Sequence, residues 1–324
     1  MRTKNEKMKE YDLIVVGELN VDLILNNIEK TPEVGKEVFA RDMTLTLGSS
    51  SAIFANNVSV LGTRTTFFGK IGDDSYADLV VSSLQKSGVN TDYIIKTKTH
   101  KTGITVAMSY AEERAMITYP GAMSVMSADD VSDGLLMKAK HMHVSSIFLQ
   151  EALLPTVHLL FKRAKSLGLT TSLDPQWDPH ENWDVDLEVL LPYVDVFLPN
   201  EGELMAMTQS STIAAGMKKI LAWSNHVIVK QGVDGATLYS GDKELHFPAF
   251  LNRKLVDAIG AGDSFNSGFI NAFIKGYPVE KCLELGTIMG AVNTTAQGGT
   301  GAFGSLDVVR NAAKEQFDFD YIID

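Results

Sequence analysis

The chain has 324 residues, of which 45% are hydrophobic, with 26 glycines and a formal net charge of −11. This composition is typical of a packed globular protein, and it argues against nucleic acids and anionic membranes as partners, because both require clustered Lys and Arg. A single cysteine, Cys282, excludes an internal disulfide and any multi-cysteine metal site. The apolar run that opens the first predicted strand is too short for a signal sequence or a membrane span, so we expect a cytoplasmic protein.

Short β-branched segments alternate with helical patterns along most of the chain. Buried strands are predicted at 12–19, 64–72, 141–147, 170–174, 195–200 and 226–232. Helices are predicted at 51–62, 74–88 and 155–168, and others begin near 263, 279 and 305. Strands that alternate with helices of this length form βαβ units around a mostly parallel sheet that is covered on both faces. The sequence therefore predicts an α/β fold with three layers, helices on both sides of a central sheet.

Two segments depart from this rhythm. Residues 37–47 and 102–119 alternate apolar and polar positions, with no helical pattern between their strands. Such alternation indicates a sheet with one face in solvent, which does not belong inside a covered parallel sheet. We expect either a small separate sheet that forms a lid over the site or a pair of peripheral hairpins. With no internal repeat or long linker in view, we expect a single domain over residues 1–324, with lid strands inserted within about 20–47 and 102–121.

The stretch 256-VDAIGAGDSFNSGF-269 carries the clearest chemical signal. Gly260, Ala261 and Gly262 form a loop almost without side chains, and a helical pattern of apolar residues follows directly. Unpaired N–H groups and the positive end of the helix dipole favour anions there, and they also favour an ionised Asp263. An anion cradle beside a carboxylate fits phosphoryl transfer to an alcohol. Taken alone, the loop also fits a glycine-rich helix start with Asp263 near the cap.

Other motifs for phosphate binding or nucleophilic catalysis fit poorly. The segment 299-GTGAFGS-305 lacks the lysine of a P-loop. The turn after the first strand, GELNVD, lacks the G-x-G-x-x-G of a dinucleotide-binding site. The segment GSSSA at 48–52 is not the G-x-S-x-G of a serine hydrolase.

The stretch DAIGAGDSFNSGF resembles the C-terminal motif D-T-x-G-A-G-D-x-F of the ribokinase/PfkB family of sugar and nucleoside kinases. Further matches follow the family's order along nearly the whole chain: GELNVD at 17–22, GSSSAIFANNVSVLG at 48–62, PNEGEL at 199–204, KQGVDG at 230–235 and GTGAF at 299–303. The resemblance implies a ribokinase-like fold with a small β-sheet lid, and an ATP-dependent kinase reaction.

The resemblance also implies a role for each matching position in catalysis. Asp263 is expected to be the general base for the acceptor hydroxyl, and the Gly260–Gly262 loop the anion hole for the phosphoryl group. Asn200 and Glu203 are expected to hold Mg²⁺ through its waters, although a polar cap between a strand and a helix is the structural alternative. Asp257 is expected to help bind a monovalent cation such as K⁺.

The same resemblance assigns the two substrates. The nucleotide is expected to lie against Lys230, Gly232, Gly235, Asn293 and Ala296. The sugar is expected to lie against Asn20, Asp22, Gly48 and Ser49. A lysine that reaches solvent and an Asx turn that closes the first strand are the structural alternatives for Lys230 and for the Asn20–Asp22 pair.

Departures from the family pattern concern the choice of substrate. Ser49 replaces the second glycine of the N-terminal pair, and Ile53 replaces a common asparagine. The segment 174-DPQWDPHENW-183 has no arginine where many sugar-acid and fructose kinases have one, which weakens the case for an acidic or pre-phosphorylated substrate. Within this segment Trp177 either stacks on a sugar or base or anchors the loop. Ala258 replaces the usual threonine, while the glycines and Asp263 remain.

These observations predict an ATP- and Mg²⁺-dependent kinase that phosphorylates a hydroxymethyl group of a small neutral sugar, ribose- or fructose-like. Lids of this family often pair between subunits, so a homodimer through the lid is expected. A nucleoside kinase of the same family is one alternative, and a sugar- or nucleotide-binding regulator without turnover is another. His141 and His143 share one face of a strand and are expected to be structural.

Overall fold

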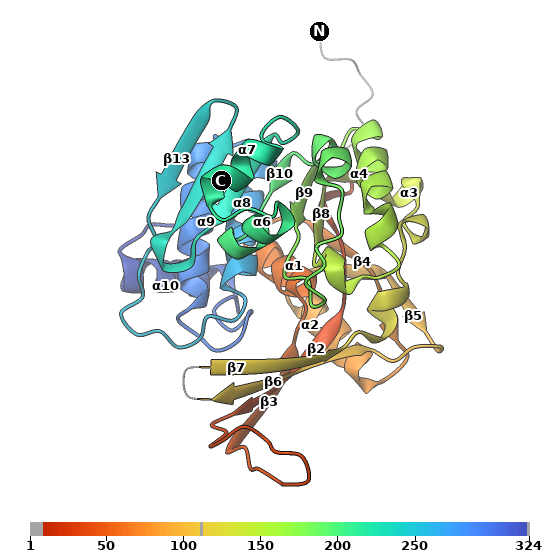
Figure 1. The fold of residues 1–324 in the computed structure, drawn as a ribbon, viewed down its shortest axis with the longest axis vertical. Coiled ribbons are helices and arrows are strands. Elements are labelled where there is room, and N and C mark those ends of the chain that lie inside the picture. The colour runs from red at the N-terminus through yellow and green to blue at the C-terminus, as the bar shows by residue number, and fades with distance from the viewer. Residues whose placement is uncertain (1–8, 111–112, 323–324) are drawn as a thin grey trace.

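The computed structural model describes residues 9–110 and 113–322. A nine-stranded sheet forms the centre of the molecule, in the strand order β13-β12-β11-β10-β9-β8-β1-β4-β5 (Figure 1). Its strands are β1 (Tyr11–Val16), β4 (Thr65–Gly72), β5 (Asn90–Thr97), β8 (Ala139–Ser145), β9 (Thr170–Asp174), β10 (Val196–Phe197), β11 (His226–Lys230), β12 (Ala236–Ser240) and β13 (Lys243–Phe247). All run in the same direction except β12, which is antiparallel to both neighbours.

Helices cover both faces of this sheet. Successive side chains of each buried strand point to opposite faces, so both faces carry apolar side chains that must be covered. On β1, Leu13 and Val15 join one hydrophobic cluster, while Ile14 and Val16 join the other. The first cluster includes α1 (Ser50–Val60), α2 (Ser75–Lys86), α8 (Ala261–Ile274), α9 (Val279–Asn293) and α10 (Leu306–Phe317). The second includes α3 (Asp133–Leu136), α4 (Val157–Ser166), α5 (Leu187–Leu190), α6 (Glu201–Met207) and α7 (Ile213–Ile220). The predicted three-layer arrangement is confirmed.

Short 3-10 helices complete the connections: Gly121–Val125, Ala128–Asp130, Ile147–Leu149, Leu154–Thr156, Leu191–Tyr193 and Gly232–Asp234. Within the described part of the chain, no helix combines the length and apolar character needed to cross a membrane.

A second, four-stranded sheet lies to one side of the central layers, in the strand order β3-β2-β6-β7 (Figure 1). Its strands are β2 (Asn20–Asn26), β3 (Asp42–Leu47), β6 (Gly103–Tyr110) and β7 (Glu113–Tyr119). The two alternating segments of the sequence therefore do form a small separate sheet. Residues 111 and 112, within the predicted lid segment 102–121, lie outside the described residues.

The boundaries of the first strand differ from the prediction. The strand ends at Val16 and not at residue 19, and Asn20 already begins a strand of the second sheet. At Gly17 the chain runs directly against the start of α1, since a Cβ there would lie 2.0 Å from Ser51 Oγ. This close approach marks the point where the chain leaves the central sheet for the second one.

Three strands of the central sheet were not predicted, namely β5, β12 and β13. The strands β5 and β13 form the two edges of the sheet and carry many exposed or half-exposed residues, so they lack the continuous apolar run of a buried strand. The segment predicted as a strand at 195–200 is also shorter, because only Val196 and Phe197 pair as β10.

Candidate active site

The start of α8 brings a bare backbone turn into the crevice beside the strands β9 and β11. Gly260 precedes the helix with a φ of +74°, and a Cβ at this position would lie 2.5 Å from Gly299 Cα. Only glycine meets both conditions, because other residues are strained in this backbone region. Within the described residues, the N–H groups of Gly262 and Asp263 have no backbone acceptor. The turn therefore offers free donors at the positive end of a helix, a place that favours anions.

A buried network of side chains holds this turn in place. Asn57 Nδ2 donates to Gly299 O and to Ser264 Oγ, both at 2.9 Å. Ser264 Oγ donates in turn to Asn293 Oδ1 at 2.9 Å, and Asn293 Nδ2 donates to Ile259 O at 2.6 Å. Asn293, which was expected beside the adenine, is therefore a fully buried brace for the loop.

Asp263 is almost fully buried in the first turn of α8, with 7% of its surface exposed. Its Oδ1 accepts hydrogen bonds from Ser50 Oγ and, at 3.2 Å, from Gln176 Nε2. Burial, aided by the negative charge of Asp174, raises the pKa of Asp263 to about 7, although Ser50 and Lys230 oppose the rise. A carboxylate with a pKa near neutrality is suited to accept a proton at physiological pH.

The raised pKa of Asp263 predicts how the free energy of unfolding depends on pH. Between its ordinary pKa near 4 and the folded value of about 7, the folded state holds a proton that the unfolded state has lost. Stability therefore falls as the pH rises through this window, and Asp263→Asn removes that fall. We expect the free energy of unfolding in urea, taken for Asp263→Asn relative to wild type, to be about 1–3 kcal/mol higher at pH 8 than at pH 5. An equal difference between the two proteins at both pH values would contradict this assignment.

Lys230 lies at the end of β11 among three carboxylates. Its Nζ donates to Asp174 Oδ2 at 2.8 Å, and Asp174 is fully buried. Burial alone would lower the pKa of Lys230, but the charges of Asp174, Glu203 and Asp263 outweigh it and raise that pKa. Burial and the charge of Asp174 raise the pKa of Glu203 to about 7. The group thus holds more negative than positive charge.

Asn200 and Glu203, expected to hold Mg²⁺, bond to each other around the start of α6. Asn200 Oδ1 accepts from Glu203 N at 2.9 Å, and Glu203 Oε2 accepts from Asn200 N at 2.8 Å. Asn200 Nδ2 also donates to Glu203 Oε1 at 2.6 Å. The polar-cap alternative is thus present in the structure. No group of three or more His, Cys, Asp or Glu side chains of the described residues is arranged to hold a metal ion.

Asp257, the third residue expected to bind a cation, joins two loops beside the anion hole. Its Oδ1 accepts from Ile259 N and its Oδ2 accepts from Gly298 N, both at 3.0 Å. The carboxylate therefore ties the segment before α8 to the loop after α9.

A cavity of about 330 Å³ opens beside the start of α8. Its lining includes Lys230, Gly232 and Gly235, the first turn of α8, and the segment 249–255. The helix α9 contributes a face of small residues at i, i+3, i+4 and i+7: Thr287, Gly290, Ala291 and Thr294. All four side chains are small, which leaves space between this helix and the start of α8. Asn293 and Ala296, expected beside the adenine, are not among the residues that line this cavity.

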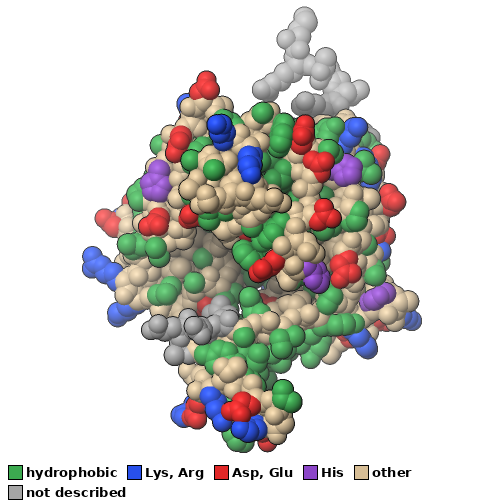
Figure 2. Space-filling model, in the orientation of Figure 1, with side chains coloured by type: hydrophobic (Ala, Val, Ile, Leu, Met, Phe, Trp, Pro, Cys, Tyr) green, Lys and Arg blue, Asp and Glu red, His purple; other side chains and the backbone are tan. Residues whose placement is uncertain are grey.

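The residues expected to bind the sugar lie at the junction of the two sheets. Asn20 Nδ2 donates to Thr105 Oγ1 at 2.9 Å and to Asp22 Oδ1 at 3.3 Å. A Cβ at Gly48 would lie 2.2 Å from Asp22 Oδ1, so Asp22 packs against a bare backbone. Burial raises the pKa of Asp22 to about 6, against the hydrogen bond from Asn20. The molecular surface is hollowed between the second sheet and the main body (Figure 2).

Ser49, which replaces a family glycine, retains the backbone that favours glycine, with a φ of +69°. Its Oγ caps α1 by accepting from Ala52 N at 3.0 Å, and it donates to Glu18 O at 2.7 Å. Glu18 is buried beneath it and accepts from Ser51 N at 3.0 Å. Burial raises the pKa of Glu18 to about 6. These bonds offset the cost of a non-glycine residue at this position.

Four residues near Asp263 were missed by the sequence analysis: Glu18, Ser50, Asp174 and Gln176. Asp174 had the clearest signal, because it is a carboxylate at the carboxyl end of a predicted buried strand, where ligands bind in open α/β sheets. Trp177 is half exposed and meets the Trp183 ring edge-on at 4.8 Å.

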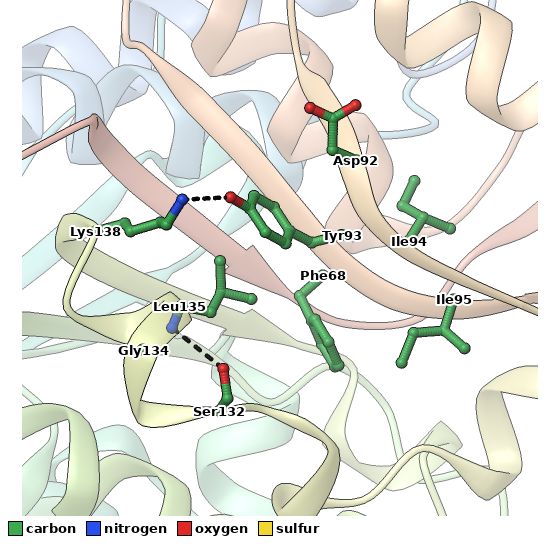
Figure 3. A pocket seen from close by; sticks show the side chains of 9 residues that line it. All are labelled: Phe68, Asp92, Tyr93, Ile94, Ile95, Ser132, Gly134, Leu135 and Lys138. Carbon is green, nitrogen blue, oxygen red and sulfur yellow. Dashed lines mark hydrogen bonds between the residues drawn. The ribbon is translucent and has the colours of Figure 1, made fainter.

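The two histidines and a second cavity lie apart from this site. His141 and His143 are fully buried and bond to serine and threonine hydroxyls of β8 and β9, in agreement with a structural role. A cavity of about 510 Å³ lies at the β5 edge of the central sheet, where Lys138 donates to Tyr93 Oη at 2.7 Å (Figure 3). None of the predicted site residues lines it.

Comparison with known proteins shows the family to which the chain belongs. The family described as pfkB family carbohydrate kinase matches residues 11–303. The chain is 26% identical over 303 residues to a deoxyribokinase of Salmonella typhi, covering 91% of this chain and 96% of that protein. It is 25% identical over 310 residues to an ATP-dependent 6-phosphofructokinase of Thermoanaerobacterium thermosaccharolyticum, covering 94% of each.

Two solved structures have the same fold. Arabidopsis thaliana ribokinase complexed with ribose and ATP superimposes with a TM-score of 0.78 at 24% identity, covering 94% of this chain and 99% of that one. A putative ribokinase II from E. coli in complex with ATP and Mg²⁺ superimposes with a TM-score of 0.81 at 23% identity, covering 94% and 100%. With its family match over most of its length, the chain belongs to the PfkB family of carbohydrate kinases, which transfer a phosphoryl group to an alcohol.

Proposed function

We propose that the protein is an ATP-dependent kinase that phosphorylates a hydroxymethyl group of a small neutral sugar, with Asp263 as general base. One observation carries the proposal. Asp263 Oδ1 is held by Ser50 and Gln176, while no donor among the described residues reaches Oδ2. The carboxylate follows Gly262 of the cavity lining, and its partner Ser50 is two residues from Gly48, which packs against Asp22. A carboxylate so placed has one oxygen left for an acceptor hydroxyl.

In this mechanism the chain's own residues position the reactants. Asn20 and Asp22 bind hydroxyls of the sugar, and Gly48 lets the sugar approach the backbone. Lys230, Gly232 and Gly235 bind the phosphate and ribose side of the nucleotide. The free N–H groups in the first turn of α8 stabilise the transferring phosphoryl group, and Asp263 takes the proton of the attacking hydroxyl.

The residues present fit Mg²⁺ as the resident cofactor, because the carboxylates around Lys230 leave unbalanced negative charge. Mg²⁺ retains several waters, so Asn200 and Glu203 would hold it through them while keeping their own bonds. When bound, the ion supplies neutralising charge for the phosphates of ATP. Asp257 would help to place a monovalent cation, and comparing rates with K⁺ and with tetramethylammonium measures that dependence.

Charge favours a neutral acceptor over an acidic or phosphorylated one. Glu18, Asp22, Asp174 and Asp263 are all acidic and lie around the proposed acceptor site, and the segment 174–183 carries no arginine. An anionic sugar would meet repulsion there that Lys230, the cation paired with Asp174, offsets only in part. A nucleoside remains the second candidate, since the half-exposed Trp177 ring is available to stack on a base.

The test is an ADP-release assay with MgATP against neutral pentoses and ketohexoses, phosphorylated sugars, sugar acids and nucleosides. We expect turnover with a neutral pentose or ketohexose. Turnover with nucleosides alone would favour the second candidate. Sugar binding in calorimetry without any ADP release would overturn the kinase assignment in favour of a regulator.

We also infer a homodimer through the second sheet, acting as a lid. The registers align Leu45, Leu23, Val106 and Ile117 across its four strands, so these side chains share one face. Ile117 is 64% exposed, and Met43 on the same face is 63% exposed. An apolar sheet face of this kind is typical of a contact surface. A monomer in sedimentation velocity at micromolar concentration would contradict this inference.

A cytoplasmic location is part of the same proposal. Cys282, the single cysteine, is buried and free, as is common in proteins of reducing compartments. Cell fractionation tests this location.

A further inference from the structure

The side chain of Gln176 links three groups at the centre of the site. Its Nε2 lies 3.0 Å from Ser50 Oγ, 3.0 Å from Asp174 Oδ2 and 3.2 Å from Asp263 Oδ1. Ionised carboxylates only accept hydrogen bonds, so the NH₂ end of the amide must face Asp174 and Asp263. This argument fixes the orientation of the amide, which the positions of its heavy atoms alone would leave open.

The backbone at Gln176 is held in a conformation that glycine prefers. Its φ is +58°, and Glu181 and Trp183 in the same loop have φ values of +53° and +54°. Asp178 fixes this loop, since its carboxylate accepts from His180 N at 2.9 Å and from Trp183 N at 2.7 Å. Residues persist in this region of backbone space only when their surroundings determine it, and such residues concentrate at functional sites.

Trp177, the next residue, adds a second anchor. A Cβ at Gly202 would lie 3.7 Å from the Trp177 ring, so the ring rests close to the first turn of α6. The loop is therefore held on both sides of Gln176, by Asp174 before it and by Trp177 after it. A loop fixed in this way presents the amide of Gln176 to Asp263 in one orientation.

We propose that Gln176 is the positioning residue that holds Asp263 Oδ1, so that Oδ2 faces the acceptor hydroxyl. The inference rests on the proposed function and deepens it. Because Gln176 faces Ser50 Oγ with N–H donors only, the single proton of Ser50 points to Asp263. The two protons of the Gln176 amide are shared among three acceptors, Ser50 Oγ, Asp174 Oδ2 and Asp263 Oδ1. Both donors act on the same carboxylate oxygen and leave the other one for the substrate.

The same amide also lies between two carboxylates of like charge. Two acidic side chains face Asp263, namely Asp174 on β9 and Glu18, just after β1. Among the described residues, Lys230 on β11 is the cation that faces Asp263. Without the NH₂ group of Gln176, Asp174 and Asp263 would face each other with one bridging donor fewer. Asp263 would then ionise less readily, and proton removal would require a higher pH.

The experiment compares Gln176→Ala with Gln209→Ala in the full chain, on whichever sugar the wild type phosphorylates. Gln209 is a matched control, because it also has a left-handed backbone, with a φ of +48°, but is exposed at the other end of α6. We expect Gln176→Ala to lower kcat by about 10- to 100-fold, from loss of a hydrogen bond to a charged group. The acidic limb of its kcat–pH profile should move to higher pH, with the KM for ATP unchanged. Gln209→Ala should match wild type in all three.

Two further variants keep the inference open to contradiction if Gln176→Ala folds poorly. Gln176→Glu keeps the size of the side chain and removes its donors, and we expect its acidic limb to move in the same direction. Combining Gln176→Ala with Ser50→Ala should cost less than the sum of the single effects, because both residues act on Asp263 Oδ1.

A pH profile of Gln176→Ala and Gln176→Glu that matches wild type, with kcat within threefold, would overturn the inference. If the Gln176 variants match wild type in this way but Asp263→Asn is inactive in the same assay, only this inference fails. If Asp263→Asn keeps wild-type turnover, the proposed function itself fails.

Discussion

Asp263→Asn is expected to lower kcat by about 10²–10⁴-fold, the usual contribution of a general base. The asparagine fills the same space, so the effect isolates the loss of a proton acceptor. The free N–H groups of Gly262 and Asp263 belong to the backbone and remain, so ATP should still bind with a similar affinity. The coupled ADP-release assay measures kcat, and calorimetry with the non-hydrolysable ATP analogue measures nucleotide binding.

Asp307→Asn is the matched control for this variant. Asp307 also lies in the first turn of a helix, α10, but it is exposed and has no part in the site. Its turnover should equal that of wild type. Turnover of Asp263→Asn within tenfold of wild type would remove Asp263 from the role of base.

Lys230→Met is expected to have the largest effect on stability. Lys230 is the cation within the group of Asp174, Glu203 and Asp263, and its side chain is 11% exposed. Removing one partner of a buried ion pair leaves the other charge uncompensated and costs about 3–5 kcal/mol of unfolding free energy. Urea unfolding at pH 8 measures this loss. The loss should shrink at pH 5, because carboxyl groups with a raised pKa take up protons and no longer need the cation.

Lys243→Met provides the comparison for a surface pair. Lys243 Nζ lies 2.7 Å from Glu280 Oε1, with 71% of the lysine side chain exposed. Exposed pairs of this kind contribute about 0–1 kcal/mol, so this variant should unfold almost as wild type does. Equal losses for Lys230→Met and Lys243→Met would contradict the account of Lys230 as a buried counter-ion of these carboxylates.

The sequence predicted those parts of the molecule that have a strong local pattern. The strand β1 and the helix α8 were found from their apolar periodicity, and Asp263 was found from the bare loop before it. The edge strands β5 and β13 were not found, because exposure at the edge removes the apolar run by which a buried strand is recognised. The sequence did not reveal the contacts that Asn293 makes with Ser264 and Ile259, since a helical pattern fixes which faces are apolar but not what each one meets.

The site residues that the sequence analysis missed are those whose contacts come from distant parts of the chain. Ser50 and Asp263 are 213 positions apart, and Gln176 is 126 positions from Ser50. No local pattern marks a serine or glutamine whose partner comes from another part of the chain. Glu18 was missed for a related reason. It follows an apolar strand, and its contacts with Ser49 and Ser51 are visible only in the folded structure.

The division into two sheets has a consequence for how such a kinase can evolve. Asn20 and Asp22 belong to β2, in a sheet whose hydrogen bonds form within itself, whereas Asp263 and the anion-binding turn belong to α8. Mutations in β2, β3, β6 or β7 can therefore reshape the recognition of an acceptor while the phosphate-handling turn and its buried braces stay intact. In the proposed function, part of the acceptor recognition and the chemistry therefore lie on separate structural units, so changes of acceptor can accumulate in the second sheet without altering the anion-binding turn.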